Sequence, residues 1–171
     1  MSDTAPSSQG SPFWRFSLSF YRLPKVADAC IALQEEAGVD VNLLLFLLWH
    51  ARQRRRLTGA EVAALEAKIA PWRDVTVIPL RSVRRALKAP PALVEAATAE
   101  AFRNRIKAVE LEAERLQQEA MFVLAPLGTA AAGADEAARA NVAAYQEMLG
   151  VHFPPGAAET LLAAFASMPG E

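Results

Sequence analysis

Residues 41–49, Val-Asn-Leu-Leu-Leu-Phe-Leu-Leu-Trp, form the most apolar stretch of the chain. In a helix these side chains would point to every side, and a helix that is apolar all round is normally buried. Asp40 precedes the stretch and can cap the helix by accepting backbone N–H bonds from its first turn. The stretch is too short to cross a bilayer, which requires about 20 apolar residues. We therefore predict a buried central helix over about residues 40–56.

The composition favours an all-α, single-domain bundle around this helix. The chain has 171 residues, of which 53% are apolar, and this is enough for one substantial core. We expect seven to eight helices, with one long helix at about 92–122. The expected organisation is a disordered tail at 1–10, a helical core at 11–124, a flexible connection at 125–134, and C-terminal helices packed on the core at 135–171.

The long helix carries an apolar seam. Its members are spaced alternately four and three residues apart, which is typical of a helix that packs against an antiparallel neighbour. They are Phe102, Ile106, Val109, Ala113, Leu116 and Ala120. The sequence therefore predicts that this row is covered by another helix.

The stretch at 75–79, Val-Thr-Val-Ile-Pro, is harder to assign. Its β-branched residues favour a strand, and Pro79 disfavours helical backbone at Ile78. A single strand would have no partner in an all-helical chain. We expect a helix kinked near Pro79, and whether 75–79 are helical stays open at this stage.

An aromatic-rich segment begins at Ser11 and Pro12, which resemble a helix cap and first turn. Phe13, Phe16 and Phe20 would share one side of this helix. We expect that side to cover the core; the alternative is a set of exposed rings that stack on nucleic-acid bases.

The charges are unevenly distributed along the chain. Residues 1–49 contain three basic and five acidic residues, residues 50–94 ten and three, and residues 95–171 five and eleven. Such asymmetry indicates either a basic surface on the middle third or docking of basic segments on acidic ones. The basic candidates fall into two groups, Arg52, Arg54, Arg55 and Arg56, and Arg81, Arg84, Arg85 and Lys88.

Two interpretations of these groups are open. As a binding face they could contact phosphates, since each neutralised phosphate releases counterions. As structural ion pairs, Arg81 and Arg85 could meet Glu110 and Glu114, because both pairs are spaced four residues apart on two antiparallel helices. We favour pairing for the second group and a solvated helix end for the first.

Signatures of catalysis and of metal binding are missing from the sequence. Neither His50 nor His152 is followed at three or four residues by a carboxylate or a second histidine. Cys30 falls on an apolar helical stripe, which disfavours a reactive thiol. We predict no catalytic residue, no metal and no cofactor. An enzyme with a helical-bundle pocket, using His50 or the pair Glu110 and Glu114, is kept as an alternative.

Several dispersed blocks resemble a family of short proteobacterial proteins known only as a domain of unknown function. The blocks are Phe13-Trp14-Arg15-Phe16-Ser17, Tyr21, Pro24-Lys25-Val26, the apolar run at 41–49, Trp72-Arg73, the 79–88 segment with Arg81, Arg84 and Arg85, and the 105–114 segment with Arg105, Glu110 and Glu114. The resemblance covers about residues 13–125. It implies a small cytosolic all-helical protein and supplies no established activity or ligand.

These observations favour a non-enzymatic protein-interaction or adaptor module that presents its basic middle third, or an apolar groove, to an unknown protein partner. The alternatives are nucleic-acid or ribosome binding through Arg52–Arg56 and Arg81–Lys88, and the enzyme described above. The first ten residues have neither the basic nor the apolar region of a signal peptide, so we expect a cytoplasmic protein that does not contact membranes. Oligomeric state is not predicted.

Overall fold

The computed structural model describes residues 10–169, which form eight α-helices, one π-helical turn and two very short strands. The helices are α1 (Pro12–Tyr21), α2 (Val26–Ala37), α3 (Val41–Arg52), α4 (Gly59–Trp72), the π-helical turn η1 (Arg73–Val77), α5 (Ile78–Ala86), α6 (Ala96–Val123), α7 (Ala134–Leu149) and α8 (Pro155–Ser167). The strands are β1 (Arg55–Arg56) and β2 (Thr129–Ala130). The predicted all-α class is confirmed. The predicted tail at 1–10 lies, except for Gly10, outside the described residues.

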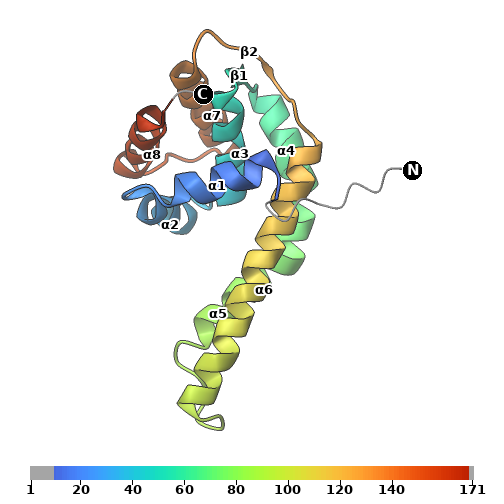
Figure 1. The fold of residues 1–171 in the computed structure, drawn as a ribbon, viewed down its shortest axis with the longest axis vertical. Helices are drawn as coiled ribbons and strands as arrows, with labels where there is room; N and C mark the ends of the chain where they lie inside the picture. Colours follow the sequence, from blue (N-terminus) through green and yellow to red (C-terminus); the bar gives the residue numbers. More distant parts are fainter. Residues whose placement is uncertain (1–9, 170–171) are drawn as a thin grey trace, which may run out of the picture.

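Helix α3 is the centre of the fold, as predicted. Every residue from 42 to 51 is buried, and α3 packs against α1, α6 and α7. Asp40 caps it, because its Oδ1 accepts the backbone N–H groups of Asn42 at 2.8 Å and Leu43 at 3.2 Å. With α1, α2, α7 and α8, α3 forms a rounded body that we call the head (Figure 1).

The predicted extension of this helix to residue 56 is wrong. The helix ends at Arg52, Arg54 has a positive φ of 55°, and β1 then pairs antiparallel with β2. The buried Asn141 side chain holds the chain here: its amide nitrogen donates to the carbonyl of Arg55 at 3.1 Å, and its oxygen accepts from the N–H of Leu57 at 2.8 Å. These bonds satisfy backbone groups that a longer helix would have paired internally.

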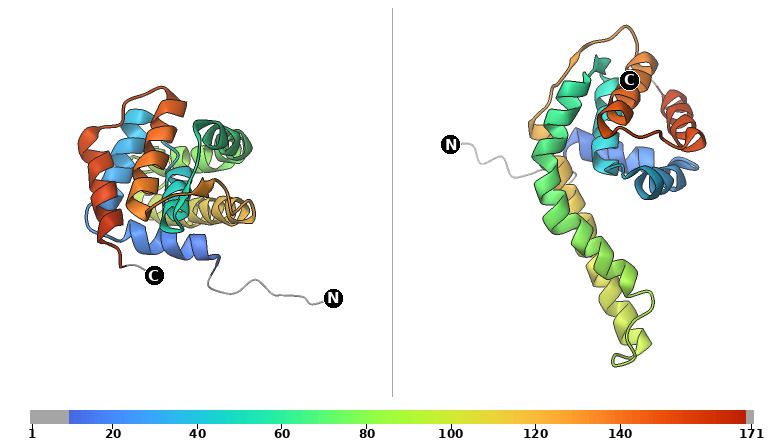
Figure 2. Two further views of the ribbon diagram at one scale, coloured as in Figure 1. Left: turned by 90° about the horizontal axis from the view of Figure 1, so that it is seen from above. Right: turned by 180° about the vertical axis from the view of Figure 1, so that it is seen from behind.

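A second region, which we call the arm, projects from the head (Figures 1 and 2). It consists of α5, residues 87–95 and the first half of α6, with α5 and α6 side by side. Residues 75–79 are helical, and no strand forms there: η1 ends at Val77 and α5 begins at Ile78. In η1 the N–H of Ile78 bonds to the carbonyl of Arg73, five residues earlier, so the helix is locally wider than an α-helix. This turn lies directly before Pro79, whose ring nitrogen has no N–H to donate.

Helix α6 begins four residues later than predicted, and its apolar seam is not covered as expected. Phe102, Val109 and Leu116 are 44%, 52% and 45% exposed. Of the six seam residues only Ala113 is buried, and the other buried positions of α6 are Ala99, Glu110, Gln117, Gln118 and Met121. Helix α5 has only nine residues and approaches α6 from the side of Glu110, so it cannot cover the seam.

The C-terminal helices complete the head. Helix α7 packs on α3, and α8 packs on α2. The segment 125–134, predicted as a flexible connection, contains β2. No helix within residues 10–169 has both the length and the apolar character needed to span a membrane.

Candidate functional site

The two predicted basic groups lie at opposite ends of the molecule, so they do not form one face. The first surrounds β1 on the head, and the second lies on α5 and the turn that follows it (Figure 1). Arg52 donates to the carbonyl of Pro169 and lies 5.7 Å from the ring centre of Phe165. Arg55 donates to the carbonyls of Leu127 at 2.6 Å and Gly128 at 2.5 Å. Arg52 therefore connects the end of α3 to the C-terminal segment, and Arg55 connects β1 to residues 127–128.

The remaining members of the first group are more exposed. Arg54 and Arg56 face solvent, and Arg56 lies 3.9 Å from Glu136. An ion pair between two such exposed side chains contributes little stability.

Two members of the second group, Arg81 and Arg84, form ion pairs between α5 and α6. Arg81 contacts Glu110 at 3.2 Å and Glu114 at 3.1 Å, and Arg84 makes two bonds to Glu110, one of them at 3.1 Å. Burial tends to raise the pKa of Glu110, but Arg84 and Arg81 outweigh it and lower this pKa. Arg81, Glu110 and Glu114 are thus brought together between α5 and α6.

Arg85 and Lys88 differ from the other residues of this group. Arg85 turns toward α2 and contacts Glu35 at 3.0 Å, so it does not meet Glu110 or Glu114. The four-residue spacing predicted Arg85 as the second arginine to pair with these glutamates. In the structure Arg84 makes that ion pair, with Glu110. Lys88 is exposed beyond the end of α5.

His50 is a structural residue of the core. Its ring is fully buried, with Nδ1 3.0 Å from the carbonyl of Phe46 and Nε2 accepting from the N–H of Leu127 at 3.1 Å. Burial lowers its pKa, so the ring is neutral near pH 7. Both ring nitrogens are occupied, and neither is available to a substrate.

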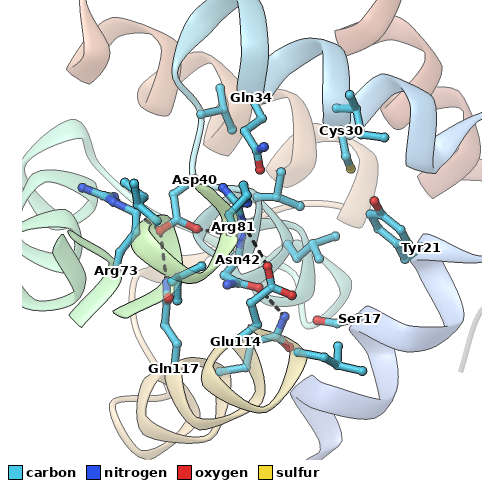
Figure 3. A pocket seen from close by; sticks show the side chains of 18 of the residues that line it. Ser17, Tyr21, Cys30, Gln34, Asp40, Asn42, Arg73, Arg81, Glu114 and Gln117 are labelled. Atoms are coloured by element: carbon cyan, nitrogen blue, oxygen red, sulfur yellow. Dashed lines mark hydrogen bonds and ion pairs between the residues drawn. The ribbon is translucent and has the colours of Figure 1, made fainter. Parts of the chain in front are cut away.

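A cavity of about 750 Å³ lies where the arm joins the head. Helices α1, α2 and α5, the turn η1, the start of α3 and the middle of α6 contribute to its wall (Figure 3). Its size is within the range of about 300–1,000 Å³ typical of small-molecule sites.

Asp40 organises one side of the cavity. While its Oδ1 caps α3, its Oδ2 accepts from Arg73 at 3.3 Å and from the amide nitrogen of Gln117 at 3.1 Å. Arg73 also contacts Glu66 at 2.7 Å and Asp74 at 3.1 Å. Burial would lower the pKa of Arg73, but these three carboxylates raise it, so the guanidinium stays charged.

Other titratable groups on the cavity wall are shifted by burial. Burial raises the pKa of Glu114 despite the nearby Arg81, and the negative charge of Glu110 adds to this increase. Burial also raises the pKa of Tyr21, and it raises that of the Cys30 thiol to about 12. Cys30 is therefore a protonated and unreactive thiol at neutral pH.

Not all buried polar groups of this wall are paired. The Ser17 hydroxyl and the amide oxygens of Gln117 and Gln118 have no hydrogen-bond partner. Figure 3 shows the Ser17 hydroxyl pointing toward the middle of the cavity, where Glu114 and Asn42 lie. Within residues 10–169, no group of three or more His, Cys, Asp or Glu side chains is placed to hold a metal ion.

A family model described as "Protein of unknown function (DUF2390)" matches residues 12–121. The chain belongs to this family. The match confirms the resemblance noted from the sequence. Neither the curated proteins nor the solved structures include a significant match to the chain.

The part of the chain that matches the DUF2390 family contains every residue of the cavity wall, from Trp14 to Gln118. It also contains α5 and nearly all of α6, whereas α7 and α8 lie outside it. The cavity and the arm are therefore features of the family segment of this protein.

The sequence contained weak signals of the cavity that the predictions missed. Asn42 is the one polar residue of the run at 41–49, and Gln117 and Gln118 interrupt the last turns of α6. A polar residue within a buried segment needs a partner. Which partners these residues meet depends on contacts between segments about seventy-five residues apart.

Proposed function

We propose that the protein is a non-enzymatic interaction module whose contact surface is the uncovered row of apolar side chains on α6. We call Phe102, Val109, Leu116 and Val123 the outer column. Its members follow one another at seven-residue intervals and are 44%, 52%, 45% and 79% exposed. Isolated exposed apolar residues are normal, but a seven-residue repeat keeps them on one side of a helix, as in coiled coils. The outer column is the observation that supports this function.

The charges beside the column favour a second copy of the chain, in antiparallel orientation, as the partner. Arg105 lies next to the first part of the column, with its guanidinium carbon 5.4 Å from the ring centre of Phe102. Glu112 and Glu119 flank the later part at the same seven-residue interval. Within the chain Glu112 pairs with Arg115 at 2.7 Å, and Glu119 accepts the N–H of Ser11 at 2.8 Å, and both keep their negative charge in these contacts. Antiparallel pairing places Arg105 of one copy near these glutamates of the other, whereas parallel pairing aligns like charges.

The other hypotheses receive less support from the contacts. The arginines that could have bound phosphates are mostly engaged by carboxylates or backbone carbonyls. For the enzyme alternative, His50 is enclosed in the core, and Glu110 and Glu114 are paired with arginines. The cytoplasmic location remains part of the proposal and is compatible with the free, buried Cys30.

Sedimentation equilibrium with matched substitutions tests the proposal. We expect the wild-type protein to be a dimer in the micromolar range, Val109→Glu to be monomeric, and Ala108→Glu to remain dimeric. Both positions are exposed on the same turn of α6, so neither substitution should disturb the fold; circular dichroism checks this. A monomeric wild-type protein, or equal dissociation of both variants, would contradict the proposal.

A further inference from the structure

The three unpartnered buried side-chain atoms of the described residues all belong to the wall of one cavity. Ser17, Gln117 and Gln118 are each at most 4% exposed. Buried polar groups are nearly always paired, because an unmade hydrogen bond leaves the full desolvation penalty. Their concentration at one place indicates a site that is completed by a ligand.

The unpaired atoms define the hydrogen bonds that this ligand must supply. The amide nitrogen of Gln117 donates to Asp40, which orients its oxygen away from that carboxylate, and the amide nitrogen of Gln118 donates to Asn42 Oδ1 at 2.8 Å. Amide oxygens can only accept, and the Ser17 hydroxyl can accept as well. The ligand must therefore carry several donors.

The charged side chains of the wall balance one another and do not select the charge of the ligand. Four guanidinium groups and four carboxylates line the cavity, those of Arg22, Arg73, Arg81 and Arg85 and of Glu35, Asp40, Asp74 and Glu114. All of them except Arg22 are joined in ion pairs within this set. The unpaired acceptors therefore decide which polar group of a ligand fits the wall.

We propose that the cavity binds a small molecule with a protonated primary amine and an apolar body. An ammonium group has three donors and no acceptor, which matches the unpaired atoms in kind and in number. The rest of the wall is suited to an apolar body, since it includes Leu18, Ile31, Leu45, Ile78 and Leu111.

This site is independent of the proposed dimer. On the helical wheel of α6, Leu111 and Gln118 of the cavity wall lie on the opposite side from Val109 and Leu116 of the outer column. Failure of one proposal therefore leaves the other testable.

Isothermal titration calorimetry of the full chain tests the site, with a series of linear primary alkylamines as probes. Alkyl carboxylates and alcohols of equal length are the matched ligands. We expect at least one amine to bind with one site per chain and to bind at least tenfold more tightly than its carboxylate and alcohol counterparts. Absence of binding throughout the amine series, or equal binding of a carboxylate, would overturn the proposal.

A substitution within α1 places the binding in this cavity. Ser17→Ala removes an unpaired buried hydroxyl, so we expect normal thermal stability but about tenfold weaker amine binding. Ser19→Ala makes the same change at an exposed position of the same helix, outside the cavity wall, and should leave binding unchanged. Equal affinities of the two variants would overturn the assignment.

Discussion

The head and the arm are stabilised by different interactions. In the head, α3 is buried over ten consecutive residues, and its Phe46 ring contacts the Phe13 ring at a centroid distance of 4.9 Å. In the arm, α5 has no fully buried residue, and the charged side chains of Arg81, Arg84 and Glu110 join it to α6. Burial of apolar surface is non-directional and large, whereas ion pairs depend on geometry and on both partners. We therefore expect the two regions to respond differently to the same kind of change.

The largest expected effect comes from truncating an aromatic side chain of the head. Phe46→Ala should lower the free energy of unfolding by about 3–5 kcal/mol, because it leaves a cavity in the core. Urea unfolding followed by circular dichroism measures this loss. The control is Leu93→Ala in the arm, where the residue is 95% exposed and a change within about 0.5 kcal/mol is expected. Equal losses would show that the two regions do not differ in this way.

A smaller and local effect is expected in the arm. Glu110→Gln removes the charge that pairs with Arg81 and Arg84, and it should weaken the α5–α6 contact by about 1–3 kcal/mol. Hydrogen exchange should then accelerate in α5 and stay unchanged in α3. Glu112→Gln, at an exposed position of α6, serves as the control and should leave exchange in α5 as in the wild type. Accelerated exchange in α3 as well would mean that the arm is not a separate unit.

These contrasts also explain which parts of the fold could be predicted. The central helix and the aromatic helix α1 followed from side-chain type and helical period alone. Helix α3 is buried over residues 42–51, and α1 buries Phe13 and Phe20 of its aromatic side. The seam on α6 was predicted to be covered, but a repeat does not specify which helix covers it. Here the short α5 approaches from the side of Glu110, and the outer column stays exposed.

The cavity depends on contacts that local patterns do not contain. Asp40 meets Gln117 across 77 residues, and Arg85 meets Glu35 across 50. The helix end at Arg52 was missed for the same reason, since Asn141 of α7 holds the chain that follows it. Charge spacing did indicate that arginines of α5 meet glutamates of α6, but it did not distinguish Arg84 from Arg85.

The starts of α4 and α6 differ in whether a side chain caps the backbone. Thr58 caps α4 by accepting the N–H of Glu61 at 3.2 Å, and Glu61 accepts the N–H of Thr58 at 2.7 Å. Thr58→Ala should lower the free energy of unfolding by about 1 kcal/mol. Thr98→Ala, near the start of α6, removes no backbone cap and should have less effect in the same urea titration. A larger loss for Thr98→Ala would contradict this account of the two helix starts.

The smallest expected effect is a dependence on pH that is confined to the head. Because burial lowers the pKa of His50 from its ordinary value of 6.5, the unfolded chain takes up the proton more readily. The contribution of His50 is fully present above pH 6.5 and is lost as the pH falls below it. Urea midpoints at one pH above and one below this value measure the change.

Substitutions of the two histidines provide the control for this pH dependence. His50→Gln should flatten it, and His152→Gln, at an exposed position, should not. Both histidines lie outside the arm, so hydrogen exchange in α5 should not follow the same pH change. An unaltered pH dependence in His50→Gln would contradict the assignment.

Native-state hydrogen exchange of the wild-type protein tests the difference between head and arm most directly. It gives a free energy of opening for each protected amide, and local units open below the global value. We predict a lower opening free energy for α5 and the first half of α6 than for α3, with α3 exchanging only through global unfolding. Equal opening free energies in α3 and α5 would show that the molecule unfolds as one unit and would contradict this account.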